Sequence, residues 1–218
     1  MVRKSKGESD ATHAALLDAA EREFVEKGVA HTTLNDVACA AGLTRGAIYW
    51  HFKDKSALVQ AMCDRVFLPM QTLLNEIAAA SVQDPLAALR QMMLHMLEQV
   101  SGNPRQRTVF DIMFHHCEKS PDLEFFNHEK EKRGECLAKI HATVQQAVAQ
   151  GHLPAATDTA LVVQAVNGYL IGLIYEWLID PQAYDLGRHA APMLDMFLAG
   201  LTARPPLKAP QPTEPAPR

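Results

Sequence analysis

Apolar residues recur along the chain at helical spacing, and alternating strand patterns are nearly absent. Leu17, Ala20 and Phe24 follow an i, i+3, i+7 pattern, and Gly28 is placed to end that helix. Later patterns, separated by glycine and proline, predict helices over 55–80, 85–102, 106–118, 123–150, 159–179 and 188–201. The whole chain predicts nine helices and no sheet, an all-α fold.

Helix-capping signals are closely spaced between residues 33 and 52. Thr33 followed by Asp36 is typical of a capping box, and Gly42 ends the short helix that this box begins. Thr44 is placed to cap a second short helix, which runs to about Phe52. Two short helices joined by a glycine turn are the sequence form of a helix-turn-helix.

The second short helix has an unusual outer face. At about 100° per residue, Ile48 and Phe52 share one face, which leaves Arg45, Tyr49 and Trp50 pointing away from the core. A groove of duplex DNA suits such a face, because arginine donates to guanine edges or phosphates and a tyrosine hydroxyl donates to phosphate. The alternative is a helical hairpin whose aromatic side chains pack on the next helix.

The charges are unevenly distributed. The net charge is −4, yet residues 1–60 hold eight Lys or Arg and eight Asp or Glu, with the bases clustered near the start and between 45 and 55. One end of the chain is therefore suited to meet phosphate. We expect a basic arm over 1–10, a helix-turn-helix domain over 11–56, a second helical domain over 57–203 and a disordered proline-rich tail over 204–218.

Composition excludes several classes of protein. No secretory signal follows Met1, and the four cysteines form no C-x-x-C, so we expect a cytoplasmic protein with reduced thiols. The apolar segment 159–179 contains Gln164, Asn167 and Glu176, which favours a buried helix over a membrane span. Neither a catalytic motif nor a metal-ligand spacing is present, so we expect no enzyme activity, no cofactor and no metal.

Several segments match one known pattern. Residues 43–56 read Leu-Thr-Arg-Gly-Ala-Ile-Tyr-Trp-His-Phe-Lys-Asp-Lys-Ser. Further segments of the same pattern are Leu16–Glu21, Asp84–Leu86, Leu153–Pro154, Gly168–Tyr169 and Trp177–Leu178. Together they resemble the TetR family of regulators, and they are especially similar to its AcrR and TtgR branch.

The resemblance implies an all-α homodimer in which each subunit has an N-terminal DNA-binding domain and a helical ligand-binding domain. Members of this branch typically bind a palindromic double-stranded DNA operator and repress a neighbouring multidrug efflux operon. They release the operator when a hydrophobic small molecule binds. The expected function is therefore that of a ligand-responsive repressor, with an inducer for which apolar burial supplies most of the affinity.

Motif positions and the outer helix face together mark the candidate DNA-binding residues. These are Thr33, Thr44, Arg45, Gly46, Tyr49, Trp50, His51 and Lys55. Thr33 and Lys55 suit phosphate oxygens, whereas Arg45 is the best candidate for a base edge.

The central helices are rich in methionine and phenylalanine, which repack easily around varied ligands but more often form plain core. The resemblance places the ligand site at Val66, Phe67, Met93, Met96, Phe110, Phe114, Leu137, His141, Val166, Asn167, Leu170 and Ile171. Asn167 and His141 are the polar groups expected to orient the ligand. A mixed-charge run over 128–135 reads as a solvated helix face.

Three alternatives remain open from the sequence. The chain can be a TetR-type regulator of another pathway with a specific metabolite as inducer. It can be an architectural DNA-binding protein without a ligand. It can also be a helical interaction or enzyme domain in which the hairpin has no DNA role.

Overall fold

The computed structural model describes residues 6–80, 83–118 and 125–209. In these ranges the chain forms nine α-helices and one π-helical turn, η1, which confirms the expected all-α fold. The elements are α1 (Lys6–Lys27), α2 (Leu34–Ala40), α3 (Arg45–His51), α4 (Lys55–Ala80), α5 (Pro85–Gly102), α6 (Pro104–Asp111), η1 (Ile112–His116), α7 (Phe125–Ala149), α8 (Thr159–Ile179) and α9 (Leu186–Ala203).

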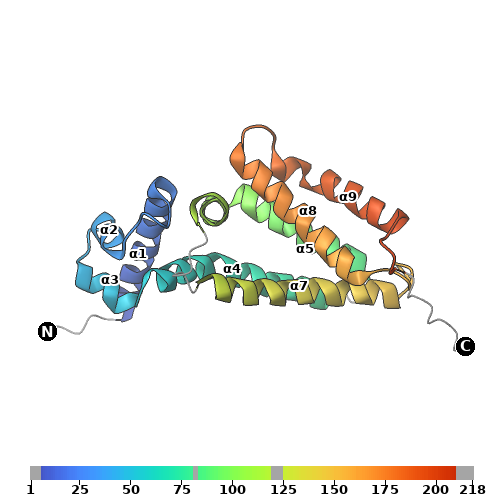
Figure 1. Cartoon of the computed structure of the whole chain (residues 1–218), viewed down its shortest axis with the longest axis horizontal. Helices are drawn as coiled ribbons and strands as arrows, with labels where there is room; N and C mark the ends of the chain where they lie inside the picture. Colours follow the sequence, from blue (N-terminus) through green and yellow to red (C-terminus); the bar gives the residue numbers. More distant parts are fainter. Residues whose placement is uncertain (1–5, 81–82, 119–124, 210–218) are drawn as a thin grey trace, which may run out of the picture.

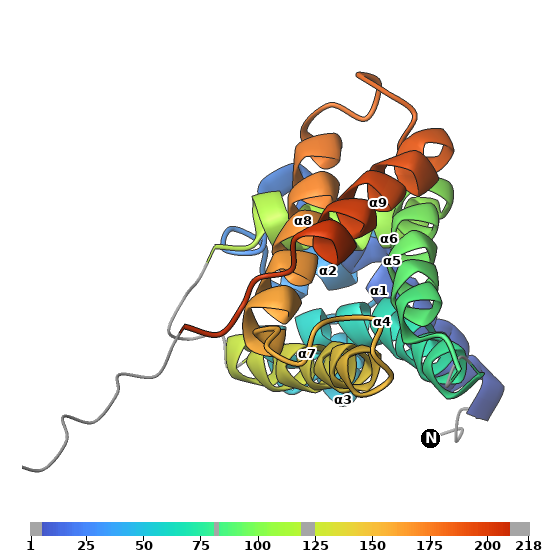
Figure 2. The same ribbon diagram turned by 90° about the vertical axis from the view of Figure 1, so that its right-hand side faces the viewer.

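The helices form a small N-terminal unit and a larger bundle. Helices α1, α2 and α3 gather at one end of the molecule, and α4 leads from them into the bundle beside α7 (Figure 1). Helices α5, α8 and α9 lie over this pair, as the view turned by 90° also shows (Figure 2). The bundle therefore has α4 and α7 as one layer, and α4 belongs to both parts of the molecule.

A first core holds the N-terminal unit together. Phe24, Ile48 and Leu58, from α1, α3 and α4, are fully buried in it. Val109 of α6 and Ile112 of η1 are also fully buried in this core, although they lie about fifty residues after Leu58 in the sequence. The first core therefore ties α6 and η1 of the bundle to the helix-turn-helix.

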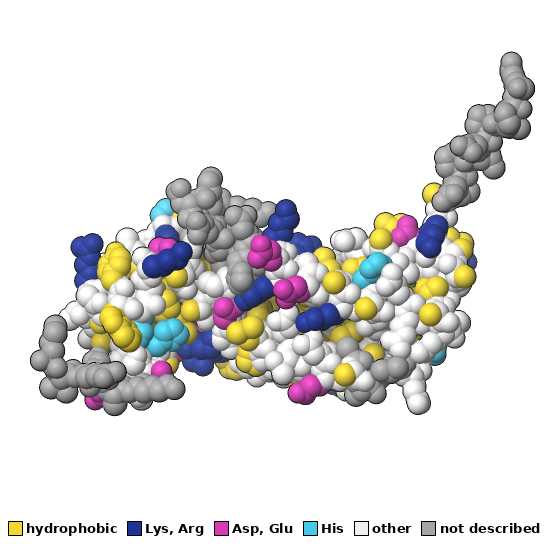
Figure 3. Space-filling model, turned by 90° about the horizontal axis from the view of Figure 1, so that it is seen from below, with side chains coloured by type: hydrophobic (Ala, Val, Ile, Leu, Met, Phe, Trp, Pro, Cys, Tyr) yellow, Lys and Arg dark blue, Asp and Glu magenta, His cyan; other side chains and the backbone are white. Residues whose placement is uncertain are grey.

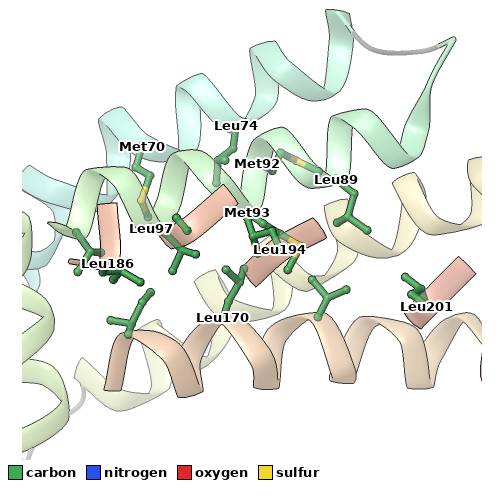
Figure 4. Packing of buried hydrophobic residues seen from close by; sticks show 14 of the residues in the cluster. Met70, Leu74, Leu89, Met92, Met93, Leu97, Leu170, Leu186, Leu194 and Leu201 are labelled. Carbon is green, nitrogen blue, oxygen red and sulfur yellow. The ribbon is translucent and has the colours of Figure 1, made fainter. Parts of the chain in front are cut away.

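A second core fills the bundle. Figure 4 shows Met93 and Leu97 of α5, Leu170 of α8, and Leu194 and Leu201 of α9 pointing into it. Leu194 and Leu201 are buried within the chain itself, so any contact of α9 with another molecule must use a different face of this helix.

Charged side chains reinforce the junction between the two parts. Arg65 of α4 donates to Asp18 of α1 at 2.7 Å and also pairs with Glu21, and Arg105 of α6 donates to the same Asp18 at 2.8 Å. The Arg65 side chain is only 19% exposed, so this network is better shielded than an ordinary surface ion pair. It links α1, α4 and α6 in addition to the first core.

Some predicted boundaries differ from the structure. Helix α1 begins at Lys6, so residues 6–10 belong to a helix and not to an arm. The helix predicted over 106–118 is α6, starting at Pro104, followed by η1. Residues 204–209 do not form a free tail, because the backbone N–H of Asp158 donates to the Pro206 carbonyl at 2.7 Å. The parts of the arm and tail over 1–5 and 210–218 lie outside the described residues.

Packing also extends the N-terminal unit beyond residue 56. Met62, Cys63 and Val66 of α4 are buried in the first core, so the unit continues for about three helical turns into α4. Helix α8 is the one helix in the described ranges that is long and apolar enough to cross a membrane. Val166 and Ile174 of this helix pack in the second core, whereas Leu161 and Ile179 are exposed, so the expectation of a buried helix holds for one face of α8 only.

Candidate DNA-binding surface and ligand cavity

The helix-turn-helix is built by the predicted caps. The Thr33 hydroxyl oxygen accepts from the Asp36 N–H at 3.2 Å, and the Asp36 carboxylate accepts from the Thr33 N–H at 2.9 Å, so the capping box is complete. The Thr33 hydroxyl also donates to the Asp36 carboxylate at 2.6 Å, and this bond, followed by that from the Thr33 N–H, lowers the pKa of Asp36. Gly42 has φ +68 in the turn, and the Thr44 hydroxyl oxygen accepts from the Ala47 N–H to cap α3.

The outer face of α3 is exposed as predicted. Tyr49 is 48% and Trp50 73% exposed, and Arg45 lies with its guanidinium 5.4 Å from the centre of the Tyr49 ring. An added Cβ at Gly46 meets only the Thr44 hydroxyl, at 3.9 Å, so packing within the chain does not require glycine there. The alternative hairpin, with its aromatic side chains packed on the next helix, does not fit these exposures. Figure 3 shows basic and hydrophobic side chains interspersed at this end of the molecule.

Two of the candidate DNA-binding residues face the protein. His51 is half-buried, and its ring lies 5.6 Å from that of His13 in α1. The Lys55 ammonium donates to the carbonyls of Val29 at 2.6 Å and Ala30 at 3.1 Å, and burial lowers the pKa of Lys55. Within the chain, the Lys55 ammonium thus ties α4 to the turn after α1, a role that the sequence did not indicate, and its phosphate contact stays a prediction.

A cavity of about 280 Å³ opens between the central helices of the bundle. Helices α4, α5, α6, α7 and α8 and η1 all contribute to its wall. Seven predicted ligand residues line it, namely Phe67, Met96, Phe110, Phe114, Leu137, Asn167 and Ile171. Its size is close to the lower end of the range for small-molecule sites, about 300 to 1,000 Å³.

Aromatic rings form one side of this cavity. Phe110 lies with its ring centre 5.2 Å from Phe67 and 5.8 Å from Phe114, and Phe114 lies 6.0 Å from Tyr175 of α8. The ring pairs are edge-to-face or tilted, geometries that aromatic pairs favour. A ligand in the cavity would therefore contact a connected group of rings that reaches from α4 to α8.

The other predicted ligand residues lie elsewhere. Met93 and Leu170 line a smaller adjoining cavity of about 30 Å³, which shares three wall residues with the larger one. Val66 is buried in the first core and Val166 in the second. His141 is hydrogen-bonded to the Thr159 hydroxyl at 2.9 Å and lines neither cavity.

On the α7 side of the cavity, sequence reasoning found Leu137 but missed its polar neighbours. Lys132, Arg133 and Cys136 line it, together with Gln71 of α4. Met70 and Leu74 complete the wall from α4. The charged run of α7 was expected to be a solvated helix face, and the packing of α7 beside α4 brings part of it to the cavity.

The histidines of η1 share one carboxylate. His115 Nδ1 lies 2.8 Å and His116 Nε2 3.6 Å from the two oxygens of Asp111, although consecutive side chains on a regular α-helix diverge by about 100°. Within the described ranges, no group of three His, Cys, Asp or Glu residues is placed to hold a metal ion.

An apolar stripe on α8 and α9 is only partly covered within the described part of the chain, where the Tyr175 ring lies 4.8 Å from that of His115. Tyr175 and Ile179 of α8 are exposed, and Met196 of α9 is 68% exposed. An added Cβ at Gly168 or Gly172 of α8 meets nothing within 4 Å. The face is thus both apolar and able to accept another backbone closely.

Comparison with known proteins gives matches over both parts of the fold. Residues 16–62 match the family described as bacterial regulatory proteins, tetR family. Residues 84–203 match the C-terminal region of MAATS-type transcriptional repressors.

Individual relatives match over nearly the whole chain. The transcriptional regulator AcrR of Shigella flexneri is 37% identical over 94% of this chain and 98% of its own. The transcriptional regulator TtgR of Pseudomonas putida is 35% identical over 95% of this chain and its full length. The structure of a SmeT–triclosan complex superposes with a TM-score of 0.76 at 30% identity, covering 95% of this chain and 100% of SmeT.

These matches confirm the resemblance to the AcrR and TtgR branch, and they agree with the exposed recognition helix and the helical bundle described above. The family comprises regulators and not enzymes, as expected from the sequence. The chain belongs to the TetR family of bacterial transcriptional regulators, and it is a repressor with a MAATS-type C-terminal region.

Proposed function

We propose that this repressor acts in the cytoplasm as a homodimer on a palindromic operator of a multidrug efflux operon, and that hydrophobic ligands release it. SmeT, to which the chain is similar, is described as the repressor of the Stenotrophomonas maltophilia multidrug efflux pump SmeDEF. The observation that carries the proposal is a largely apolar cavity whose wall shares α4, α6 and η1 with the first core.

Helix α3 enters the major groove with its outer face. Arg45 contacts a base edge, and Tyr49 donates to a phosphate. Thr33 and Thr44 keep their hydroxyl oxygens on the helix N-termini that they cap, and in the proposed complex both lie beside the DNA backbone. Trp50 is apolar and exposed, so it gains from the partial burial that the DNA surface provides.

Two subunits are needed because one recognition helix reads too few base pairs. The apolar stripe with Gly168, Gly172, Tyr175, Ile179 and Met196 is the proposed dimer interface. A symmetric dimer that reads adjacent major grooves places its two recognition helices about 34 Å apart. The palindrome of the operator then follows from the two-fold axis of the protein.

Release follows from contacts that the ligand makes on two elements. Phe67 lies in α4, twelve residues after Lys55, so a ligand that shifts it also tilts the helix leading to the N-terminal unit. Phe110 and Phe114 line the cavity. Val109, which precedes Phe110, and Ile112, which lies between the two phenylalanines, are buried in the first core. A ligand that favours the tilted arrangement weakens operator binding by no more than its difference in affinity between the two arrangements.

The test begins with a footprint of the protein on DNA upstream of its own gene and of neighbouring efflux genes. We expect a short protected palindrome that is lost when hydrophobic drugs are added. Arg45→Ala should lose about 1–3 kcal/mol of operator binding and relax specificity at one base position. Tyr49→Ala should weaken binding to all sequences without changing the fold.

Each outcome decides between the proposal and an alternative. Uniform coating of DNA would support an architectural protein, and absence of binding would refute the DNA-binding role. A protected palindrome released by one metabolite, and not by a drug panel, would support a regulator of another pathway. Phe114→Arg places a charge in the cavity and should abolish release while operator binding remains.

A further inference from the structure

The charged residues in the cavity wall all have the same sign. Lys132 and Arg133 line the cavity from α7, and none of the described lining residues is Asp or Glu. The remaining wall is apolar except for two side-chain amides and one thiol. Along the described part of the wall, a ligand inside the cavity therefore meets positive but no negative charge.

The two cations differ in their partners. Lys132 forms an ion pair with Asp64 of α4, which also accepts from Gln60 at 2.8 Å, so its charge is largely compensated within the protein. Arg133 is exposed and makes no ion pair or hydrogen bond with any described residue. The guanidinium of Arg133 is thus the uncompensated charge of the cavity wall.

The other polar groups of the wall can also donate. Burial raises the pKa of the Cys136 thiol, which keeps this sulfur protonated and uncharged at neutral pH. Asn167 and Gln71 line the cavity, and their amides have no hydrogen bond with the described residues. An amide NH₂ and a thiol can both donate to an anion.

We propose that the cavity selects an amphiphile with an apolar, preferably aromatic body and an anionic end such as a carboxylate or phenolate, which Arg133 binds. The body packs against Phe67, Phe110 and Phe114, and the anionic end lies at the α7 side of the cavity. A cationic ligand of the same size is disfavoured, because it would lose hydration beside Arg133 without gaining an acidic partner. This inference rests on the proposed use of the cavity for an inducer.

A matched pair of fluorescent probes tests the inference. Pyrenebutanoate and pyrenebutylammonium have the same ring system and nearly the same length but opposite charge, and each is titrated against the full-length protein. We expect the anionic probe to bind at least about tenfold more tightly, the effect of one charge-assisted interaction. Arg133→Gln should remove most of this preference, and Arg133→Glu should reverse it.

Two controls separate charge from volume. Lys208→Glu makes the same charge change at an exposed side chain that does not line the cavity, and it should leave the preference unchanged. Leu137→Trp fills part of the cavity and should weaken both probes by a similar factor, since Leu137 is a wall residue without charge.

The inference is overturned if the wild type binds both probes equally, prefers the cation or binds neither. It is also overturned if Arg133→Glu behaves as wild type. Operator release is measured separately with the same probes. Selective binding without release contradicts the proposed inducer role of the cavity but leaves the charge selection by Arg133 intact.

Discussion

The Lys55 ammonium can serve the fold, through its hydrogen bonds to backbone carbonyls, or DNA binding, through a phosphate contact. One substitution distinguishes these two roles. Lys55→Met keeps an unbranched side chain of similar length and removes the ammonium. If the ammonium serves the fold, the variant loses stability, because the carbonyls of Val29 and Ala30 lose their donor. If it serves DNA, the variant keeps its stability and loses a phosphate contact.

The expected loss follows from the burial of the two carbonyls. Val29 is fully buried, so its carbonyl has little access to water, whereas Ala30 is exposed and water can replace the donor there. One buried acceptor without its partner costs about 1–3 kcal/mol. Removing the partly buried charge, whose desolvation lowers the pKa of Lys55, offsets part of this. We expect a net loss of about 1–2 kcal/mol, or roughly 2–8 °C in Tm for a chain of this size.

The assay combines urea unfolding at fixed protein concentration with operator binding at several salt concentrations. Lys53→Met is the matched control, since the Lys53 side chain is 71% exposed and 3.5 Å from Asp54, and its stability should change by less than about 0.5 kcal/mol. Lys55→Met should leave the salt dependence of operator binding unchanged. An unchanged urea midpoint, together with a salt slope lower by about one, would refute our interpretation and restore Lys55 as a phosphate contact.

Three further predictions concern α3, the α8 surface and the first capping box. Gly46→Ala should raise stability by up to about 1 kcal/mol yet weaken operator binding, measured by thermal unfolding and DNA titration; unchanged binding would contradict the close approach of DNA. Gly172→Leu should sediment as a monomer, whereas the control Gly134→Leu, at another position open to an added Cβ, should sediment as a dimer. If both variants are dimers, the interface lies elsewhere. Because the pKa of Asp36 is lowered in the folded protein, its capping contribution to stability should be present above the ordinary pKa of 3.8. It should be lost as the pH falls through the lower pKa of the folded state. Hydrogen exchange in α2 should show this acid dependence in the wild type and lack it in Asp36→Asn.

The helices could be predicted because their limits depend on local chemistry. Thr33 and Thr44 cap helices that begin one residue later, and Asp84 caps α5 through the Ala87 N–H at 2.9 Å. Each interaction spans three residues and needs no information from the rest of the fold. The exposed face of α3 followed from the same local logic, because Ile48 alone determines which side of so short a helix is buried.

The cavity wall and Lys55 could be predicted only in part, since both depend on contacts between distant segments. The ammonium of Lys55 binds carbonyls 25 and 26 residues earlier, which a run of basic residues does not reveal. Arg133 belongs to a charged stretch of α7 whose orientation is fixed by packing against α4 and α5. Likewise, the aromatic spacing of Phe110 and Phe114 is typical of a buried helix face, and only the fold shows that this face borders a cavity.

In the proposed mechanism, the register of α6 and η1 is what would let the cavity and the DNA surface influence one another. Phe110 and Phe114 contact the cavity, Ile112 is fully buried in the first core, and the His116 carbonyl accepts from the Val29 N–H at 2.8 Å. That hydrogen bond lies next to the carbonyl held by Lys55. A displacement of this segment by ligand therefore changes contacts on the turn that precedes α2. By thermodynamic linkage, operator binding must then lower ligand affinity by the same factor by which ligand lowers operator affinity, so either measurement gives the coupling.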